Sequence, residues 1–268
     1  MRSLSIALIS CILLVVTGAF ASQVNVHYQE GAARGFMILR TTGGTAIADG
    51  QNMQTARGYR VQSRLIFHFK DGSLYDDTTV YTERGVFRLV SDHSIEKGPS
   101  FKTQMETYID ASAGQVSVRY LDGHKTKFLR QKMKLPPDIS NGILNIIVKN
   151  LYPSPATTVS YLAFTPKPKL VKLVFTRAGE QTCFTDGAPH EAIHYVMKVD
   201  IGGVTGAVAS VFGKVPADTQ FWLLDGAPPG FVGSEGPLYG NGPVWRIDLV
   251  SPVRSGAAAH AAEGDPHR

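Results

Sequence analysis

Cysteine is almost absent from this sequence, which has only Cys11 and Cys183 among its 268 residues. Two cysteines form at most one bridge, which excludes a scaffold held together by several disulfides. Charge is also scarce, because 18% of the residues are charged whereas 43% are hydrophobic. Disordered chains have the opposite balance, so the composition predicts a folded protein with a core of its own.

Several motifs of enzyme sites are missing as well. The sequence has no G-x-S-x-G nucleophile elbow, and Val208 stands where a phosphate-binding loop ending in Gly213-Lys214 needs its first glycine. Asp76 and Asp77 are neighbours on an expected strand, so they face opposite sides and cannot act as one carboxylate pair. Basic residues are dispersed among the expected strands. We therefore predict no catalytic residue, no cofactor and no nucleic-acid partner.

The two ends of the chain differ from its middle. Arg2, an uncharged apolar run from Leu4 to Phe20 and the small-residue site at 19–21 predict a signal peptide at 1–21, with an uncleaved anchor as the alternative. Cleavage lowers the net charge from +5 to +4 by removing Arg2, and leaves Cys183 as the one thiol. Residues 253–268 are mostly small and polar, which predicts a disordered tail. We expect one β-rich domain at 22–252, exported to the periplasm or cell envelope of a bacterium.

The dominant hydrophobic period is two, which predicts strands. Asp71-Gly72 and Asp122-Gly123 separate alternating runs and predict two hairpins. Glycines and prolines crowd residues 226–243, which predicts a long irregular loop. We expect a mainly β fold, with a curved antiparallel sheet as a half-barrel or open barrel and later strands at 157–165, 169–177, 190–201, 219–224 and 244–250.

One segment has a different period. Apolar residues from Ile139 to Leu151 recur at spacings of three and four, after Pro136-Pro137-Asp138 and before Pro153. This pattern predicts a helix of about 12 to 14 residues, capped by Asp138 or Ser140 and packed on the sheet.

The segment His190-Glu191-Ala192-Ile193-His194 matches the H-E-x-x-H motif of zinc hydrolases. That chemistry needs a helix, whereas the alternation of apolar residues from Ile193 to Ile201 predicts a strand. Two histidines four residues apart on a strand are about 13 Å apart, too far for one metal ion. We therefore predict no metal site, and keep a zinc-dependent hydrolase as an alternative.

A glycine-rich segment, 201–213, carries no charge. It fits a buried turn in the core, or an apolar flap at the mouth of a lipid-sized cavity that the predicted helix also lines. For the second interpretation we predict a set of apolar ligand-binding residues: Ile143, Ile147, Val204, Val208, Val211, Phe212 and Trp222.

The chain has its expected elements in a particular order: a signal peptide, antiparallel strands, a helix that begins after a Pro-Asp pair, and further strands. Lys214-Val215-Pro216, residues 220–224 and a last strand at 245–249 follow. In this it resembles uncharacterised exported bacterial proteins that contain a domain of unknown function. The resemblance implies a half-barrel similar to the periplasmic lipoprotein carriers, and it assigns no catalytic residue.

Three functions follow from these patterns. The first is a non-enzymatic envelope protein that binds or carries an apolar or amphipathic ligand such as a lipid, with peripheral association with the envelope. The second is the zinc-dependent hydrolase, and the third is a structural envelope component. The sequence indicates no oligomeric state.

Overall fold

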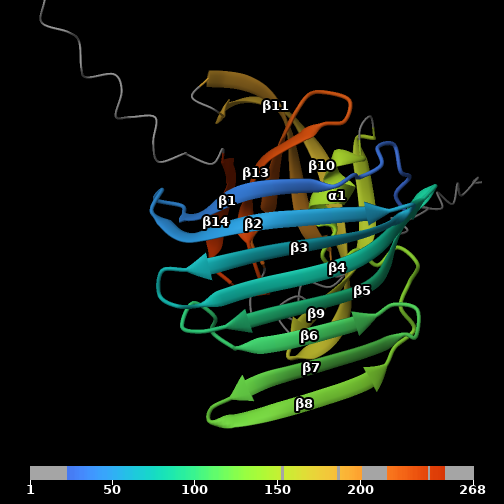
Figure 1. The fold of residues 1–268 in the computed structure, drawn as a ribbon, viewed down its shortest axis with the longest axis vertical. Coiled ribbons are helices and arrows are strands. Elements are labelled where there is room, and N and C mark those ends of the chain that lie inside the picture. The colour runs from blue at the N-terminus through green and yellow to red at the C-terminus, as the bar shows by residue number, and fades with distance from the viewer. Residues whose placement is uncertain (1–22, 152–153, 186–187, 201–215, 241, 251–268) are drawn as a thin grey trace, which may run out of the picture.

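A computed structural model shows one antiparallel sheet that does not close into a barrel (Figure 1). It describes residues 23–151, 154–185, 188–200, 216–240 and 242–250. Within these residues the sheet has 14 strands, with β8 and β9 at its edges, and one short helix is present. This confirms the predicted mainly β fold with a curved antiparallel sheet and one packed helix.

The N-terminal half of the sheet is a series of hairpins, in which each strand pairs with the next one along the chain. Gly72 and Gly123 both have positive φ, 83° and 59°, so both predicted Asp-Gly turns form. The strands are β1 (Ala33–Thr41), β2 (Ala46–Arg57), β3 (Arg60–Phe69), β4 (Leu74–Arg84), β5 (Val86–Lys97), β6 (Met105–Asp110), β7 (Gln115–Asp122) and β8 (Lys125–Lys132).

The C-terminal half joins the first where β14 pairs with β1. The five strands predicted after residue 151 are confirmed, although β10 extends eight residues beyond the predicted end at Arg177. The strands are β9 (Ala156–Thr165), β10 (Lys167–Thr185), β11 (Ala188–Asp200), β12 (Thr219–Leu224), β13 (Gly230–Pro237) and β14 (Val244–Val250).

The prediction of a long irregular loop at 226–243 is wrong, because β13 lies inside it and pairs with both β12 and β14. Its glycines are needed there. A Cβ on Gly233 would lie 2.6 Å from the carbonyl oxygen of Ile247, and one on Gly236 would overlap Thr219. Glycine in a strand marks such a close approach, but by composition alone it looks like a loop.

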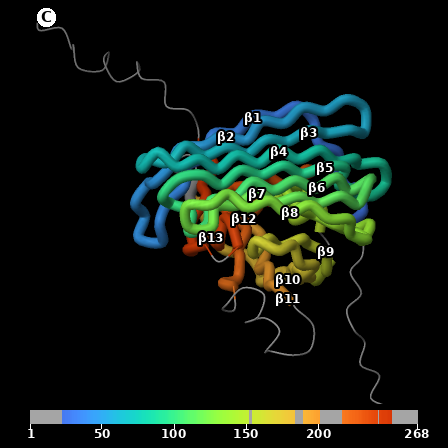
Figure 2. Tube along the Cα trace, turned by 90° about the horizontal axis from the view of Figure 1, so that it is seen from below, coloured from blue at the N-terminus to red at the C-terminus, as the bar shows by residue number. Residues whose placement is uncertain are grey.

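The sheet curls so that its two halves face each other. Figure 2 shows β1–β8 as one layer and β9–β13 beneath it. Between the layers, Tyr81 and Phe87 of the first half pack in one buried cluster with Phe175 and Phe221 of the second half and with the helix. The inner faces of both halves therefore supply the core.

The helix α1 (Leu144–Lys149) has six residues, so the predicted length of 12 to 14 is wrong. Gly142 has φ of +70°, a left-handed conformation that interrupts the helix on its N-terminal side. The predicted caps act elsewhere: Asp138 Oδ2 accepts a hydrogen bond of 2.9 Å from the backbone N–H of Ser160, and Ser140 Oγ donates to the carbonyl oxygen of Asp138.

The segment 138–142 instead covers the edge strand β9. Ile139 forms a parallel bridge with Ser160. The side-chain amide of Asn141 donates to the carbonyl oxygen of Leu162 at 3.0 Å, and its carbonyl oxygen accepts from the N–H of Leu162 at 2.9 Å. An unpaired strand edge invites aggregation, so these bonds protect it.

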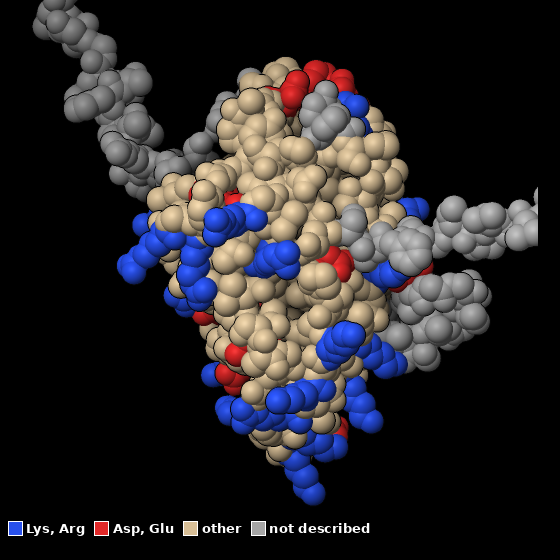
Figure 3. Space-filling view, turned by 90° about the vertical axis from the view of Figure 1, so that its right-hand side faces the viewer, with Lys and Arg blue, Asp and Glu red and all other residues tan. Residues whose placement is uncertain are grey.

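The other edge, β8, is protected by charge. Lys and Arg side chains gather at the lower end of the molecule in Figure 3. They include exposed side chains of β7 and β8, namely Arg119, Lys125, Lys127, Arg130 and Lys132. Basic residues on an edge strand oppose pairing with another chain. The dispersed arrangement that we expected from the sequence does not hold at this edge.

Three predicted segments lie outside the described residues: the signal peptide at 1–21, the tail at 253–268 and the glycine-rich segment at 201–213. Among the helices that the structure does describe, none has the length and apolar character needed to cross a membrane.

Candidate ligand-binding cavity

A cavity lies between the two halves of the sheet and has two adjoining compartments. The first, of about 380 Å³, is the acidic compartment, because Asp77, Asp92 and Glu96 line it. The second, of about 200 Å³, is the apolar compartment. Tyr75, Asp77, Gly142, Tyr161 and Tyr239 line both. Apolar side chains line much of the rest of the second compartment, among them Leu39, Leu65, Leu173, Val199, Phe221 and Ile247.

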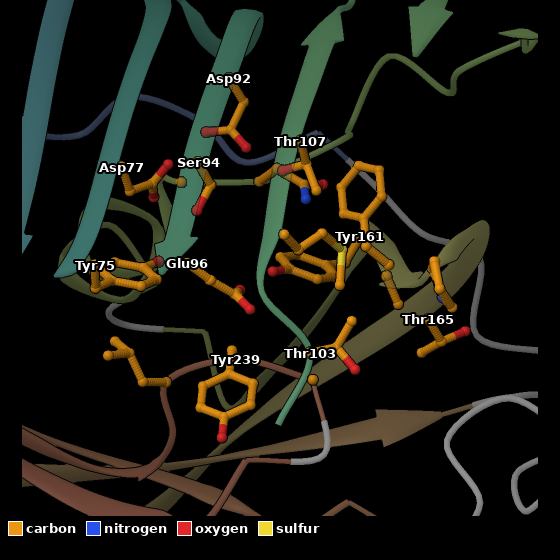
Figure 4. A pocket seen from close by; sticks show the side chains of 18 of the residues that line it. Tyr75, Asp77, Asp92, Ser94, Glu96, Thr103, Thr107, Tyr161, Thr165 and Tyr239 are labelled. Carbon is orange, nitrogen blue, oxygen red and sulfur yellow. The ribbon is translucent and has the colours of Figure 1, made fainter. Parts of the chain in front are cut away.

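The register of β4 and β5 places the three carboxyls on one face. Asp77 lies opposite Ser94, and Tyr75 lies opposite Glu96. Because side chains alternate along a strand, Asp77, Asp92 and Glu96 all point to the inner face of the curl. Figure 4 shows the three on the neighbouring strands, with Tyr161 and Tyr239 across the cavity.

Asp76, the neighbour of Asp77 on β4, points to the opposite face of the sheet. It lies on the outer face, where Arg64 Nε and Nη2 donate to its two carboxylate oxygens at 2.8 and 2.5 Å. The prediction that Asp76 and Asp77 face opposite sides therefore holds. The sequence does not predict that Asp77 meets a second carboxyl, that of Asp92, from β5.

Asp77 and Asp92 form a coupled pair. Burial raises the pKa of Asp92 to about 6, although a hydrogen bond of 2.8 Å donated by Thr79 Oγ1 opposes the rise. Burial raises the pKa of Asp77 well above its usual range, and the neighbouring charge of Asp92 raises it further. Two adjacent buried carboxyls share a proton more readily than they carry two charges.

Asp77 has an unsatisfied atom. The residue is 9% exposed, and its Oδ1 has no hydrogen-bond partner although it is buried. A buried polar atom without a partner costs about 1 to 3 kcal/mol. Such an atom in the wall of a cavity is available to a donor group that enters the cavity.

Glu96 completes the acidic compartment. Burial raises the pKa of Glu96 to about 8. Within the described residues, no Lys or Arg forms an ion pair with Asp77, Asp92 or Glu96. Lys102 also lines this compartment, but it is exposed. Among the described residues, therefore, the carboxyls face the cavity without a bound counter-charge.

Gly142 closes one wall of the cavity. A Cβ at this position would overlap Thr79 and the Asp92 carboxylate, and φ of +70° disfavours any other residue. The segment that interrupts the predicted helix thus brings its backbone directly against the acidic pair.

The predicted site residues are only partly brought together. Ile143 and Ile147 are both 1% exposed and lie in the core cluster around the helix. Trp222 points away from it, stacking on His194 with ring centroids 5.4 Å apart and donating to Gln181 at 2.9 Å. Val204, Val208, Val211 and Phe212 lie outside the described residues. A ligand-binding role for the set stays a prediction.

The H-E-x-x-H segment lies in β11, so the predicted strand is confirmed. His190 pairs in register with Cys183, and His194 Nε2 lies 3.1 Å from Gln220 Oε1. The described part of the chain has no group of three His, Cys, Asp or Glu side chains placed to hold a metal ion. This geometry does not support the zinc-hydrolase alternative.

The fold and its cavity thus define an open, curled antiparallel sheet with an acidic and an apolar compartment between its halves. No family model matches the chain, and no curated protein matches its sequence. A solved structure, the hypothetical lipoprotein YmcC from Escherichia coli, is similar over 82% of this chain and 84% of that chain. The TM-score is 0.33 and the sequence identity 10%, so no functional residue is assigned from it.

Proposed function

We propose that this protein binds an amphipathic ligand, without catalysis, in the cavity between the two halves of its sheet. The observation that carries the proposal is the contrast between the adjoining compartments. One presents carboxyls and tyrosines, and the other presents mainly apolar side chains. A ligand with a polar head and an apolar tail matches both surfaces at once.

The sizes suit this role. Small-molecule sites span about 300 to 1,000 Å³, and the acidic compartment of about 380 Å³ already lies in this range. Each methylene that leaves water for an apolar wall contributes about 0.8 kcal/mol. A short alkyl chain in the apolar compartment would therefore supply most of the affinity, and the polar head would supply specificity.

We further propose that the protein acts in the periplasm or cell envelope of a bacterium. The support is the signal-peptide pattern of residues 1–21, with Arg2 before an uncharged apolar run. Detection of the mature protein in a periplasmic or membrane fraction, with its N-terminus determined by mass spectrometry, tests this location.

The ligand-binding proposal is tested by purifying the protein without detergent and identifying co-purified molecules by solvent extraction and mass spectrometry. Val199→Phe fills the apolar compartment from β11. Val196→Phe, on the opposite face of the same strand, is the matched control. We expect an amphipathic molecule at near-stoichiometric amounts in the wild type and the control, and its loss in Val199→Phe.

Equal amounts in all three proteins would contradict binding in this cavity. No bound molecule, together with no binding of added amphiphiles by calorimetry, would favour the structural envelope component instead.

A further inference from the structure

We infer that the acidic compartment receives an organic ammonium group, so that the ligand is an amphipathic amine or quaternary ammonium compound. The inference rests on the proposed function, because it names the head group of the ligand that the cavity would hold. The geometry that points to it is the convergence of Asp77, Asp92 and Glu96 on one cavity, where no Lys or Arg of the described ranges is paired with them.

The first argument is Asp77, whose carboxyl shares a hydrogen bond with Asp92 but keeps one oxygen without a partner. It is 9% exposed, lines both compartments, and its Oδ1 has no hydrogen-bond partner. In Figure 4 its side chain lies on the same inner face as Tyr75 and beside Ser94, and Glu96 lies beside Tyr75. An N–H donor or a positive charge brought by a ligand would satisfy this oxygen, whereas an anionic head group would meet three carboxyls.

The second argument comes from another part of the same strand. Glu83 of β4 is also buried, but there Glu30 lies beside it and Lys149 of α1 is paired with Glu30 at 2.5 Å. The protein thus supplies its own cation where buried acids serve the fold. Around Asp77 the part of the chain that the structure describes supplies no paired cation, which leaves that position open to a ligand.

The third argument is the surrounding aromatic rings. Tyr75, Tyr161 and Tyr239 line the same compartment as the carboxyls. Ring faces attract cations, most strongly where water is excluded, and they accommodate N-methyl groups that cannot donate hydrogen bonds. A combination of carboxyls and aromatic rings therefore fits an organic cation.

The pH dependence of binding comes from ionisation of the three carboxyls, and other ionisable groups face them from the surrounding elements. They are Tyr75 of β4, Tyr161 of β9, Tyr239 after β13, and the exposed Lys102 between β5 and β6. His93, on the outer face of β5, interacts with Asp92 through its charge. A cation binds ionised carboxyls best, so its affinity should rise between pH 6 and pH 8.5.

The experiment is isothermal titration calorimetry of the delipidated protein with decyltrimethylammonium, decyl sulfate and decyl maltoside, each below its micelle concentration. These probes share a tail and differ in the charge of the head group. We expect the ammonium to bind at least tenfold more tightly than either other probe, and more tightly at pH 8.5 than at pH 6.

The variants Asp77→Asn and Glu96→Gln should each weaken ammonium binding at least tenfold and leave decyl maltoside binding unchanged. Asp76→Asn, which neutralises the adjacent residue on the outer face, should leave ammonium binding unchanged. Thermal unfolding of each variant verifies that it is folded.

Equal binding of all three probes, or ammonium binding that Asp77→Asn leaves intact, would overturn the ammonium inference while the proposed amphiphile binding stands. Failure of all three probes to bind the delipidated wild type would contradict both.

Discussion

Two buried acidic clusters lie along the inner face of β4, and they differ in what surrounds them. In the paired cluster, Lys149 contacts Glu30, Gln54 donates to Glu30, and the Glu30 N–H donates to Glu83. In the acidic compartment, Asp77, Asp92 and Glu96 line a cavity, and Asp77 Oδ1 has no partner. Asp77 and Glu83 are six residues apart on the same strand, so strand and face do not explain the difference.

The difference between the two clusters indicates which buried charges support the fold. A buried acid with a cation and hydrogen bonds is costly to disrupt, because removing one partner leaves the other uncompensated. A buried acid with an unsatisfied oxygen already reduces stability, so its presence needs another explanation. Here the explanation we propose is a ligand.

The largest effect is expected from Lys149→Met. This change leaves Glu30 and Glu83 buried side by side without a cation, and should lower the free energy of unfolding by about 3 to 5 kcal/mol in urea denaturation. Lys198→Met, which removes an exposed pair with Asp218, is the control and should cost less than about 1 kcal/mol. Equal losses in the two variants would show that the paired cluster has no special role.

A smaller but substantial effect is expected from Gly142→Ala. The new Cβ overlaps Thr79 and Asp92 and is strained by φ of +70°, so the change should cost about 2 to 3 kcal/mol in urea denaturation. Gly72→Ala has a similar φ of +83° but no neighbour near the new atom, and should cost about 1 kcal/mol. If both variants lost similar free energies of unfolding, backbone strain alone would explain the cost at Gly142, without the overlap with Thr79 and Asp92.

The acidic compartment should also make stability depend on pH. The folded pKa of Glu96, about 8, and that of Asp92, about 6, both exceed the values of an unfolded chain. The folded state therefore binds more protons, and its stability falls as the pH rises from about 5 to 8. We expect the melting temperature to fall by several degrees over this range.

Glu96→Gln tests the source of that dependence, because it removes a group whose pKa is raised to about 8 by burial. Its melting temperature should vary less between pH 5 and 8 than that of the wild type, in buffers of equal ionic strength. An unchanged slope in the variant would assign the pH dependence to other groups.

Much of the sheet could be predicted from the sequence, because alternation and Asp-Gly turns are local signals. These signals predict both hairpins and the strand character of 190–200. The strand β13 is not predicted, because its glycines resemble a loop in composition. They are explained only by close contacts with Ile247 and Thr219, which lie on other strands. The apolar period predicts too long a helix. The left-handed Gly142 and the hydrogen bonds of Asp138 and Asn141 to β9 hold the residues before Leu144 in a non-helical conformation.

The acidic compartment was missed for a related reason. In the sequence the neighbouring carboxyl of Asp77 is Asp76, whereas in the fold its neighbours are Asp92 and Glu96 on the adjacent strand. A signal was present: polar residues at 75, 77 and 79, and again at 92, 94 and 96, fall on the faces that should be buried. Only the pairing register of β4 and β5 shows that the two runs meet.

Thermal unfolding of the wild type and Asp77→Asn, each with and without decyltrimethylammonium, tests the central claim most directly. Without the ligand, we predict that Asp77→Asn melts at the same temperature as the wild type or higher, because it removes a buried ionisable group that lies beside the Asp92 carboxyl. With the ligand, the wild type should gain more stability than the variant, because the variant binds the ligand at least tenfold more weakly. A variant that melts several degrees lower, and that the ligand stabilises as much as the wild type, would show that Asp77 serves the fold and not a ligand.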